Sequence, residues 1–220
     1  MNSRPLIHTA LLAALLLLGV GGCQTAYYSV METFGKEKRD LLKNALTNAG
    51  EAQQAATEQF KDALTQLKEL TAFDGGKLEA RYTSFKAEYE ACEKDASAVS
   101  GRIRKVERIA GDLFAEWEKE LNEITNANLR ADSRRKLTQT RGRYEQLHAS
   151  LTKAESSMPP VLTQMKDYVL YLKHNLNAVA IGSLKTEAES ISSEINRLIG
   201  DMNRSIQQTE SFVKELAAQE

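Results

Sequence analysis

Proline is scarce in this sequence. Average usage of about 5% predicts roughly eleven prolines in a chain of this size. The sequence has three, and none lies between Arg39 and Met158. Because proline lacks the backbone donor that a helix interior needs and clashes with the preceding turn, its scarcity favours long, uninterrupted helices.

Cysteine and an excess of one charge are also lacking. Two cysteines exclude a scaffold built on disulfides, and a formal net charge of −1 disfavours binding of nucleic acid through bulk charge. With 42% hydrophobic residues and 27% charged residues, the chain is not expected to be disordered as a whole. The sequence has no G-x-S-x-G, no phosphate-binding glycine loop and no C-x-x-C. We therefore expect no enzyme activity, no cofactor and no metal.

The first residues are typical of a secretion signal. Arg4 supplies a positive start, residues 6–18 form an apolar run, and residues 20–22 are small. The run is shorter than the ~20 residues that a membrane-spanning helix needs, so a permanent transmembrane anchor is disfavoured. Val-Gly-Gly-Cys, ending at Cys23, resembles the bacterial lipobox, which implies cleavage after residue 22 and lipidation of Cys23. By resemblance to lipoprotein sorting rules, Gln24 implies export to the outer membrane, facing the periplasm.

Seam positions recur at alternating intervals of four and three residues in the mature chain, a pattern typical of coiled coils. The longest run comprises Leu78, Tyr82, Phe85, Tyr89, Cys92, Ala96, Val99, Ile103, Val106, Ala110, Leu113 and Trp117. An earlier run comprises Leu42, Leu46, Ala49, Gln53, Ala56, Phe60, Ala63, Leu67 and Leu70. The last run comprises Leu184, Ala188, Ile191, Ile195, Leu198, Met202, Ser205, Thr209, Phe212 and Leu216. The pattern predicts an all-α fold, an elongated antiparallel helical bundle or coiled coil of four or five helices, as a single domain over 23–220.

Breaks in the pattern divide the domain. A turn is expected at 73–76, where aspartate precedes two glycines, and a second break at 125–132, which is rich in asparagine. Pro159 and Pro160 should end a third helix. Gly182 and a candidate capping box at 186–189 leave open whether the remainder is one helix or two. The expected helices cover about 27–72, 77–125, 131–158, 161–183 and 186–217.

A basic stretch follows the second break. It contains Arg130, Arg134, Arg135, Lys136, Arg141 and Arg143, opposed within the stretch only by Asp132. One interpretation is a patch for nucleic acid or lipid phosphate. The favoured interpretation is charge pairing across a hairpin with the acidic segment that would face it, which contains Asp112, Glu116, Glu118, Glu120 and Glu123.

A polar cluster interrupts the otherwise apolar segment 161–184. It consists of Tyr171, Lys173, His174, Asn175 and Asn177. Two interpretations remain: a recognition site, or a satisfied polar network in the core that sets the helix register. His174 has no second ligand at helical spacing, which argues against a metal pair. Elsewhere, Cys92 lies on a seam and is expected to be a buried, inert thiol.

Three blocks resemble one bacterial family, Domain of Unknown Function 2959. They are residues 27–40 (YYSVMETFGKEKRD), 113–118 (LFAEWE) and 172–178 (LKHNLNA). The resemblance runs from about Tyr27 to Phe212. It implies a secreted or lipid-anchored helical protein of Gram-negative bacteria and implies no activity.

Two functional hypotheses follow. The first is a non-enzymatic, lipid-anchored periplasmic scaffold or adaptor for an unknown envelope protein, attached to the membrane through its N-terminal lipid. The second is a binding module that recognises a ligand or partner through the cluster at 171–177. No nucleic acid partner is expected, and self-association stays open.

Overall fold

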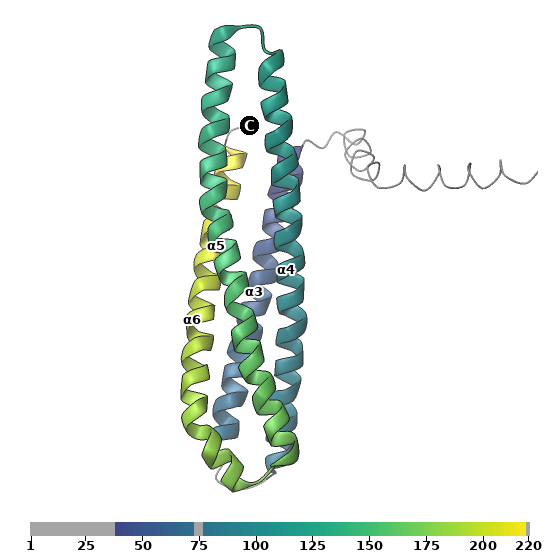
Figure 1. Cartoon of the computed structure of the whole chain (residues 1–220), viewed down its shortest axis with the longest axis vertical. Helices are drawn as coiled ribbons and strands as arrows, with labels where there is room; N and C mark the ends of the chain where they lie inside the picture. Colours follow the sequence, from purple (N-terminus) through teal and green to yellow (C-terminus); the bar gives the residue numbers. More distant parts are fainter. Residues whose placement is uncertain (1–37, 73–76, 219–220) are drawn as a thin grey trace, which may run out of the picture. The chain divides into compact units, whose positions relative to one another are not determined.

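The computed structural model describes residues 38–72 and 77–218, and these are helical apart from short connections. Four helices follow one another: α3 (Lys38–Thr71), α4 (Leu78–Glu123), α5 (Ala127–His174) and α6 (Ala178–Ala217). The chain divides into two units, Met1–Leu41 and Leu42–Glu220. Within the second unit, the four helices run lengthwise beside one another (Figure 1). The predicted all-α bundle is confirmed.

The predicted seam of α4 is buried through the middle of the helix. Its buried members include Phe85, Tyr89, Cys92, Ala96, Val99, Ile103, Val106, Ala110 and Leu113. At the ends of the run, Leu78, Tyr82 and Trp117 are only half-buried. Full burial of a large apolar side chain stabilises a fold by about 1.5–3 kcal/mol. Repetition of this burial along α4 therefore holds the helix in the bundle.

The connection between α4 and α5 is short and capped. α4 ends at Glu123 and α5 begins at Ala127, four residues before the predicted start at 131. Asn126 caps α5, because its side-chain oxygen accepts hydrogen bonds from the backbone N–H groups of Asn128 at 3.0 Å and Leu129 at 3.2 Å. The predicted hairpin is thus confirmed, with its turn at the asparagine-rich segment.

The prediction that Pro159 and Pro160 end a helix is wrong, because α5 continues through both prolines to His174. Both prolines are exposed, so the carbonyl groups that lose their helical donors can be solvated. Met158, Val161 and Met165 on the other side of the helix are buried. Burial on either side of the prolines outweighs the cost of the interrupted ladder, which is about 3 kcal/mol.

The boundaries predicted for the last two helices are also wrong. The break lies at residues 175–177, not between 183 and 186, and Gly182 is an exposed position inside α6. Asn177 caps α6 by accepting a hydrogen bond from the N–H of Ala180 at 3.0 Å. A side-chain cap satisfies a donor that the first helical turn leaves unpaired, and an isolated glycine in a packed helix only weakens it. Segment 161–217 therefore belongs to two helices, of which the first is the end of α5.

Candidate functional site: polar groups in the bundle core and at its ends

A buried polar layer joins α3 to α6. It consists of Gln53, Thr57, Ser205 and Thr209, each with an exposed fraction of 2% or less. The Ser205 hydroxyl donates to the Gln53 side-chain oxygen at 3.1 Å. The hydroxyls of Thr57 and Thr209 donate to the backbone carbonyls of Gln53 and Ser205, at 2.8 and 2.9 Å. The layer therefore has one side-chain hydrogen bond between the two helices.

The amide nitrogen of Gln53 lacks a hydrogen-bond partner among the described residues, although it is buried. A buried donor without a partner costs about 1–3 kcal/mol. Close to it, a Cβ added at Gly50 would lie 3.7 Å from Cγ2 of Thr209, an ordinary contact. The α3–α6 interface is therefore close-packed, but it contains one buried hydrogen-bond donor, the amide nitrogen of Gln53, that lacks a partner among the described residues.

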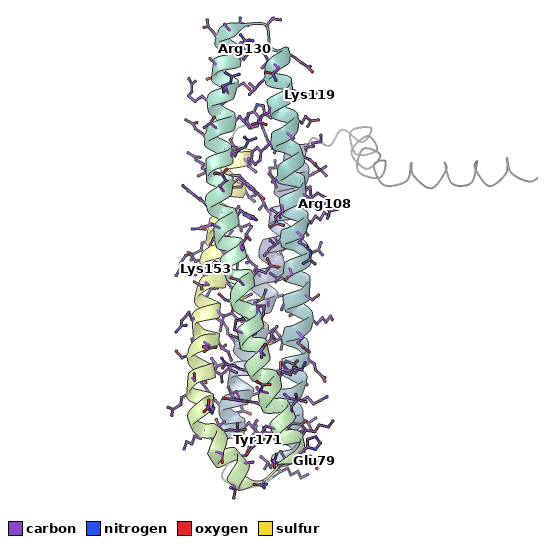
Figure 2. All side chains as sticks on the ribbon, in the orientation of Figure 1. Glu79, Arg108, Lys119, Arg130, Lys153 and Tyr171 are labelled. Atoms are coloured by element: carbon purple, nitrogen blue, oxygen red, sulfur yellow. The ribbon has the colours of Figure 1, made fainter. Side chains whose placement is uncertain are left out.

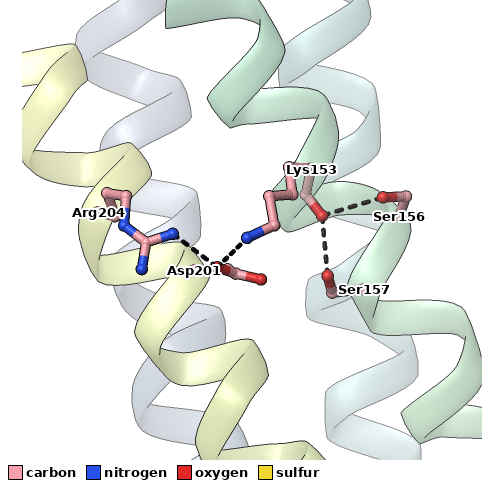
Figure 3. A network of polar contacts seen from close by, with 5 residues as sticks. All are labelled: Lys153, Ser156, Ser157, Asp201 and Arg204. Atoms are coloured by element: carbon pink, nitrogen blue, oxygen red, sulfur yellow. Dashed lines mark hydrogen bonds and ion pairs between the residues drawn. The ribbon is translucent and has the colours of Figure 1, made fainter.

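A charged cluster joins α5 to α6 one turn from this layer. The Asp201 side chain is 7% exposed, and its Oδ1 accepts from Lys153 Nζ at 2.7 Å and from Arg204 Nη1 at 2.9 Å (Figure 3). The hydrogen bond from Lys153, helped by the charges of Lys153 and Arg204, lowers the pKa of Asp201 despite partial burial. The cations themselves are 60% and 59% exposed. Asp201 therefore connects two helices at the edge of the core.

The predicted charge pairing across the α4–α5 hairpin is found between Arg141 and Glu118. Arg141 Nη1 lies 2.6 Å from Glu118 Oε1, and its guanidinium stacks over the ring of Phe114 at 5.2 Å. Other basic residues pair differently from the prediction. Arg143 contacts Glu215 of α6 at 2.6 Å, while Arg135 and Lys136 share Asp132 inside α5. The difference arises because α6 reaches as far as Arg143, and because side chains three and four residues apart on one helix are neighbours.

Aromatic side chains gather where the hairpin meets the end of α6. The rings of Phe114 and Tyr144 lie 5.5 Å apart, and those of Tyr144 and Phe212 lie 6.3 Å apart. Burial, with a smaller contribution from the charge of Glu107, raises the pKa of Tyr144 to about 12. His148 stacks on Tyr144, and its Nε2 lies 2.7 Å from Glu107 Oε1. These contacts join α4, α5 and α6 at one level of the bundle.

A hollow of about 260 Å³ lies between α5 and α6 beside this aromatic group. It is lined by Arg143, Gln146, Leu147, Gln208, Ser211, Phe212 and Glu215. Its two charged groups, Arg143 and Glu215, pair with each other. The pair neutralises the charge of both residues, so the hollow offers no isolated charge for a ligand.

The predicted polar cluster lies at the turn between α5 and α6. Tyr171 is 40% exposed, and Lys173, His174, Asn175 and Asn177 are exposed as well. The interpretation as a core network is therefore wrong, because α5 ends here and these side chains do not enter the seam. Instead, Asn175 donates from its side chain to the carbonyl of Tyr171 at 3.0 Å, and Asn177 caps α6. The recognition interpretation stays untested.

The predicted burial of Cys92 is confirmed. Its side chain is fully buried and forms no disulfide. Burial, helped by nearby carboxylates such as Glu88, raises the pKa of the thiol. The thiol is therefore protonated at neutral pH and unreactive. Cys23 lies outside the described residues.

Two other kinds of site are absent from residues 38–72 and 77–218, the part of the chain that the structure describes. No cluster there contains three or more histidine, cysteine or carboxylate side chains placed to hold a metal ion. None of its helices combines the length and apolar character needed to cross a bilayer.

Comparison with known proteins gives one family. The sequence model described as "Protein of unknown function (DUF2959)" matches residues 27–216, nearly the whole chain. No curated protein matches the chain.

Replacing Gln53 by methionine tests the cost of the unpaired amide. Methionine has a similar length and no donor, and the Ser205 hydroxyl can turn to a carbonyl of its own helix. We expect Gln53→Met to raise the free energy of unfolding by about 1–2 kcal/mol, measured by urea denaturation. Gln54→Met, at an exposed neighbouring position, is the control and should change it by less than about 0.5 kcal/mol. Destabilisation by Gln53→Met would contradict a net cost of the buried amide.

Asp201→Asn should make stability less sensitive to acid. Because the folded-state pKa of Asp201 is lowered, its contribution is present above the unfolded pKa of about 3.9 and disappears as pH falls through the folded value. We expect the variant to lose about 1 kcal/mol at neutral pH, a modest value because both cations are exposed. The loss should vanish at strongly acidic pH. Urea denaturation across this range measures it, and the same substitution in a Lys153→Met background should have a smaller effect.

Proposed function

Because the chain belongs to the DUF2959 family of proteins of unknown function, whose description names no activity, we propose a role from its own residues. The protein is a non-enzymatic scaffold or adaptor of the bacterial envelope, attached by a lipid at Cys23 and facing the periplasm. The observation that supports this proposal most is the pair of long helices α4 and α5, packed along a continuous seam.

Helix length gives such a scaffold its reach. α4 has 46 residues and α5 has 48, which at 1.5 Å per residue is about 70 Å. Contacts between neighbouring helices stiffen the bundle at several levels. They include Gln59 with Glu88, Lys153 with Asp201, and Gln164 with Glu194. A bundle joined in this way can hold a partner at a defined distance from its point of attachment.

The anchor is supported by the sequence before the bundle. An apolar run at 6–18 and three small residues precede Cys23. Several acyl chains on one cysteine give durable attachment, since each buried methylene contributes about 0.8 kcal/mol. Fourteen residues separate Cys23 from Lys38, where α3 begins, and such a segment spans at most about 50 Å. The bundle is therefore tethered close to the membrane.

Blocking lipoprotein processing tests the anchor. We expect globomycin, which inhibits cleavage of lipoprotein signals, to cause accumulation of the unprocessed chain, seen as a slower band on immunoblots. Cys23→Ser should accumulate in the same way without the drug and should lack labelling by radioactive palmitate. Cys92→Ser is the matched control and should be processed normally. Normal processing of the wild-type chain in the presence of globomycin would contradict lipidation.

A second candidate function is recognition of a partner at the α5–α6 turn. Exposed apolar side chains favour it: Leu170, Tyr171 and Val179 are 50%, 40% and 80% exposed. Lys173 and His174, which lie between them in the sequence, are exposed as well. A surface that combines apolar and cationic side chains is suited to a protein partner.

Alanine at Lys173 and His174 separates recognition from structure. Both side chains are exposed at the end of α5, so we expect the double variant to lose less than about 1 kcal/mol of stability. If the turn binds a partner, a photo-crosslinker at position 171 gives an adduct in cells that the double variant abolishes. Lys185→Ala, exposed on α6, is the control. Asn177→Ala is less suitable because it removes the α6 cap. An adduct of unchanged yield in the double variant would contradict recognition through Lys173 and His174.

A further inference from the structure

The α4–α5 hairpin extends past the end of α6 (Figure 1). Arg143 of α5 pairs with Glu215 in the last turn of α6, whereas α5 begins only at Ala127. The intervening part of α5 corresponds to about 25 Å of helix. We call the segment from Lys119 to Lys136 the hairpin tip.

The hairpin tip is a folded structure. Leu121 in the tip and Leu137 next to it are 3% and 4% exposed, although α4 and α5 are the only described helices that reach this level (Figure 1). Beside them, the Trp117 indole N–H of α4 donates to the Ser133 hydroxyl of α5 at 2.9 Å. The tip therefore presents its outer side chains on a firm support.

The outer side chains of the tip combine positive charge with one large apolar group. Leu129 is 63% exposed. Arg130, the next residue, lies near the end of the hairpin (Figure 2). The tip has five cations (Lys119, Arg130, Arg134, Arg135 and Lys136) against three anions (Glu120, Glu123 and Asp132). Arg135 and Lys136 remain 65% and 62% exposed although both contact Asp132. The local excess is positive in a chain whose net charge is −1.

The tip lies at the end of the second unit that contains the first turns of α3 after Leu42 and the last turn of α6. The hydrogen bond between Ser205 and Gln53, and the closeness of Thr209 to the position that a Cβ at Gly50 would take, show that α3 and α6 are antiparallel. Within the second unit, the part of α3 that follows Leu42 therefore lies beside the end of α6, and the hairpin projects beyond the end of α6. The projection of about 25 Å is shorter than the ~50 Å that the fourteen residues after Cys23 can span. A lipid at Cys23 and the tip can therefore reach the same surface.

We propose that the α4–α5 hairpin tip docks on the anionic lipid surface in which Cys23 is anchored. This inference rests on the proposed lipid anchor. The guanidinium and ammonium groups of Arg130, Arg134, Arg135 and Lys136 bind lipid phosphates, and Leu129 inserts at the level of the headgroups. The tip thereby adds a second attachment to the acyl chains and sets the direction in which the bundle leaves the membrane.

Fluorescence quenching in vesicles tests the contact. The full-length lipidated chain is reconstituted in vesicles of phosphatidylethanolamine and phosphatidylglycerol that contain a lipid with a nitroxide on its headgroup. A fluorophore is attached through Leu129→Cys or, at the opposite end of the bundle, through Val179→Cys, where the native side chain is 80% exposed. Cys92 is buried and should not react. We expect several-fold stronger quenching at position 129 than at position 179.

Charge reversal and lipid composition show what drives the contact. Arg130→Glu with Arg134→Glu should reduce quenching at position 129 to the level at position 179. Arg102→Glu with Arg108→Glu makes the same charge change at exposed positions of α4 outside the tip and should leave it unchanged. Quenching should also fall in phosphatidylcholine vesicles and in high salt, because ions screen exposed charges beyond about 10 Å at 0.1 M.

The outcomes separate the two proposals. Failure of the wild-type chain to float with vesicles would contradict the lipid anchor. A chain that floats but is quenched equally weakly at positions 129 and 179 has an anchor without tip docking, which overturns the inference. Equal quenching at position 129 in neutral and anionic vesicles would overturn recognition of anionic lipid.

Discussion

Burial of one narrow stripe along each helix is the constraint on which the structure depends. In α4, Phe85, Cys92, Val99 and Val106 are spaced by seven residues and are fully buried. Isolated helices are only marginally stable in water, so helices of this length persist mainly because the stripe is packed. The same packing explains why polar and charged groups concentrate on the outer faces and at the two ends. The middle of the bundle leaves little room for chemistry, apart from the layer around Gln53.

The layer around Gln53 fixes the register of α3 against α6, which an apolar seam alone does not determine. A seam made only of leucine and alanine can be shifted by one heptad with little change in buried area. Ser205 donates to Gln53 across 152 residues of sequence, and a shift of α3 against α6 would leave both groups buried without this partner. Gln53 therefore has two effects: its unpaired nitrogen costs stability, and its hydrogen bond with Ser205 favours one register of α3 against α6. The contacts of Asp201 with Lys153 likewise favour one register of α5 against α6. A shift between these two helices is already restricted by the short turn that connects them.

The sequence predicted the fold well where a pattern repeats and poorly where a few residues decide. The four-three spacing identified the seams, and the asparagines at 126 and 128 located the α4–α5 turn. Pro159 and Pro160 misled the boundary prediction because their effect depends on exposure, and a sequence does not show which side of a helix faces solvent. The cap at Asn177 was overlooked because Gly182 gave a stronger local signal. Burial on both sides of the prolines lets α5 continue through them, and the capping side chain of Asn177 sets the start of α6.

The candidate sites were predictable to a smaller extent. Burial of Cys92 followed from its position on the seam, whereas Gln53 and Ser205 were placed on seams without any sign that they meet, since their contact depends on the register of distant helices. Asp201 lies off the seam rhythm, and its role depends on Lys153 of another helix. The cluster at 171–177 had the composition of a buried network, but the end of α5 exposes it. Polar residues in an apolar segment therefore indicate either a core network or a helix end, and only the cap distinguishes them.

The two ends of the bundle carry different side chains, and each end is suited to a different kind of contact. The hairpin tip combines basic side chains with Leu129, while the α5–α6 turn combines Tyr171 and Val179 with Lys173 and His174. The two surfaces are separated by the whole of α5, about 70 Å. If the tip rests on lipid, the stiffness of the seam holds the turn at that distance from the membrane, whereas a flexible tether would let it fall anywhere within its reach. The scaffold and binding hypotheses are then compatible, because a binding surface at the far end needs a rigid support of fixed length.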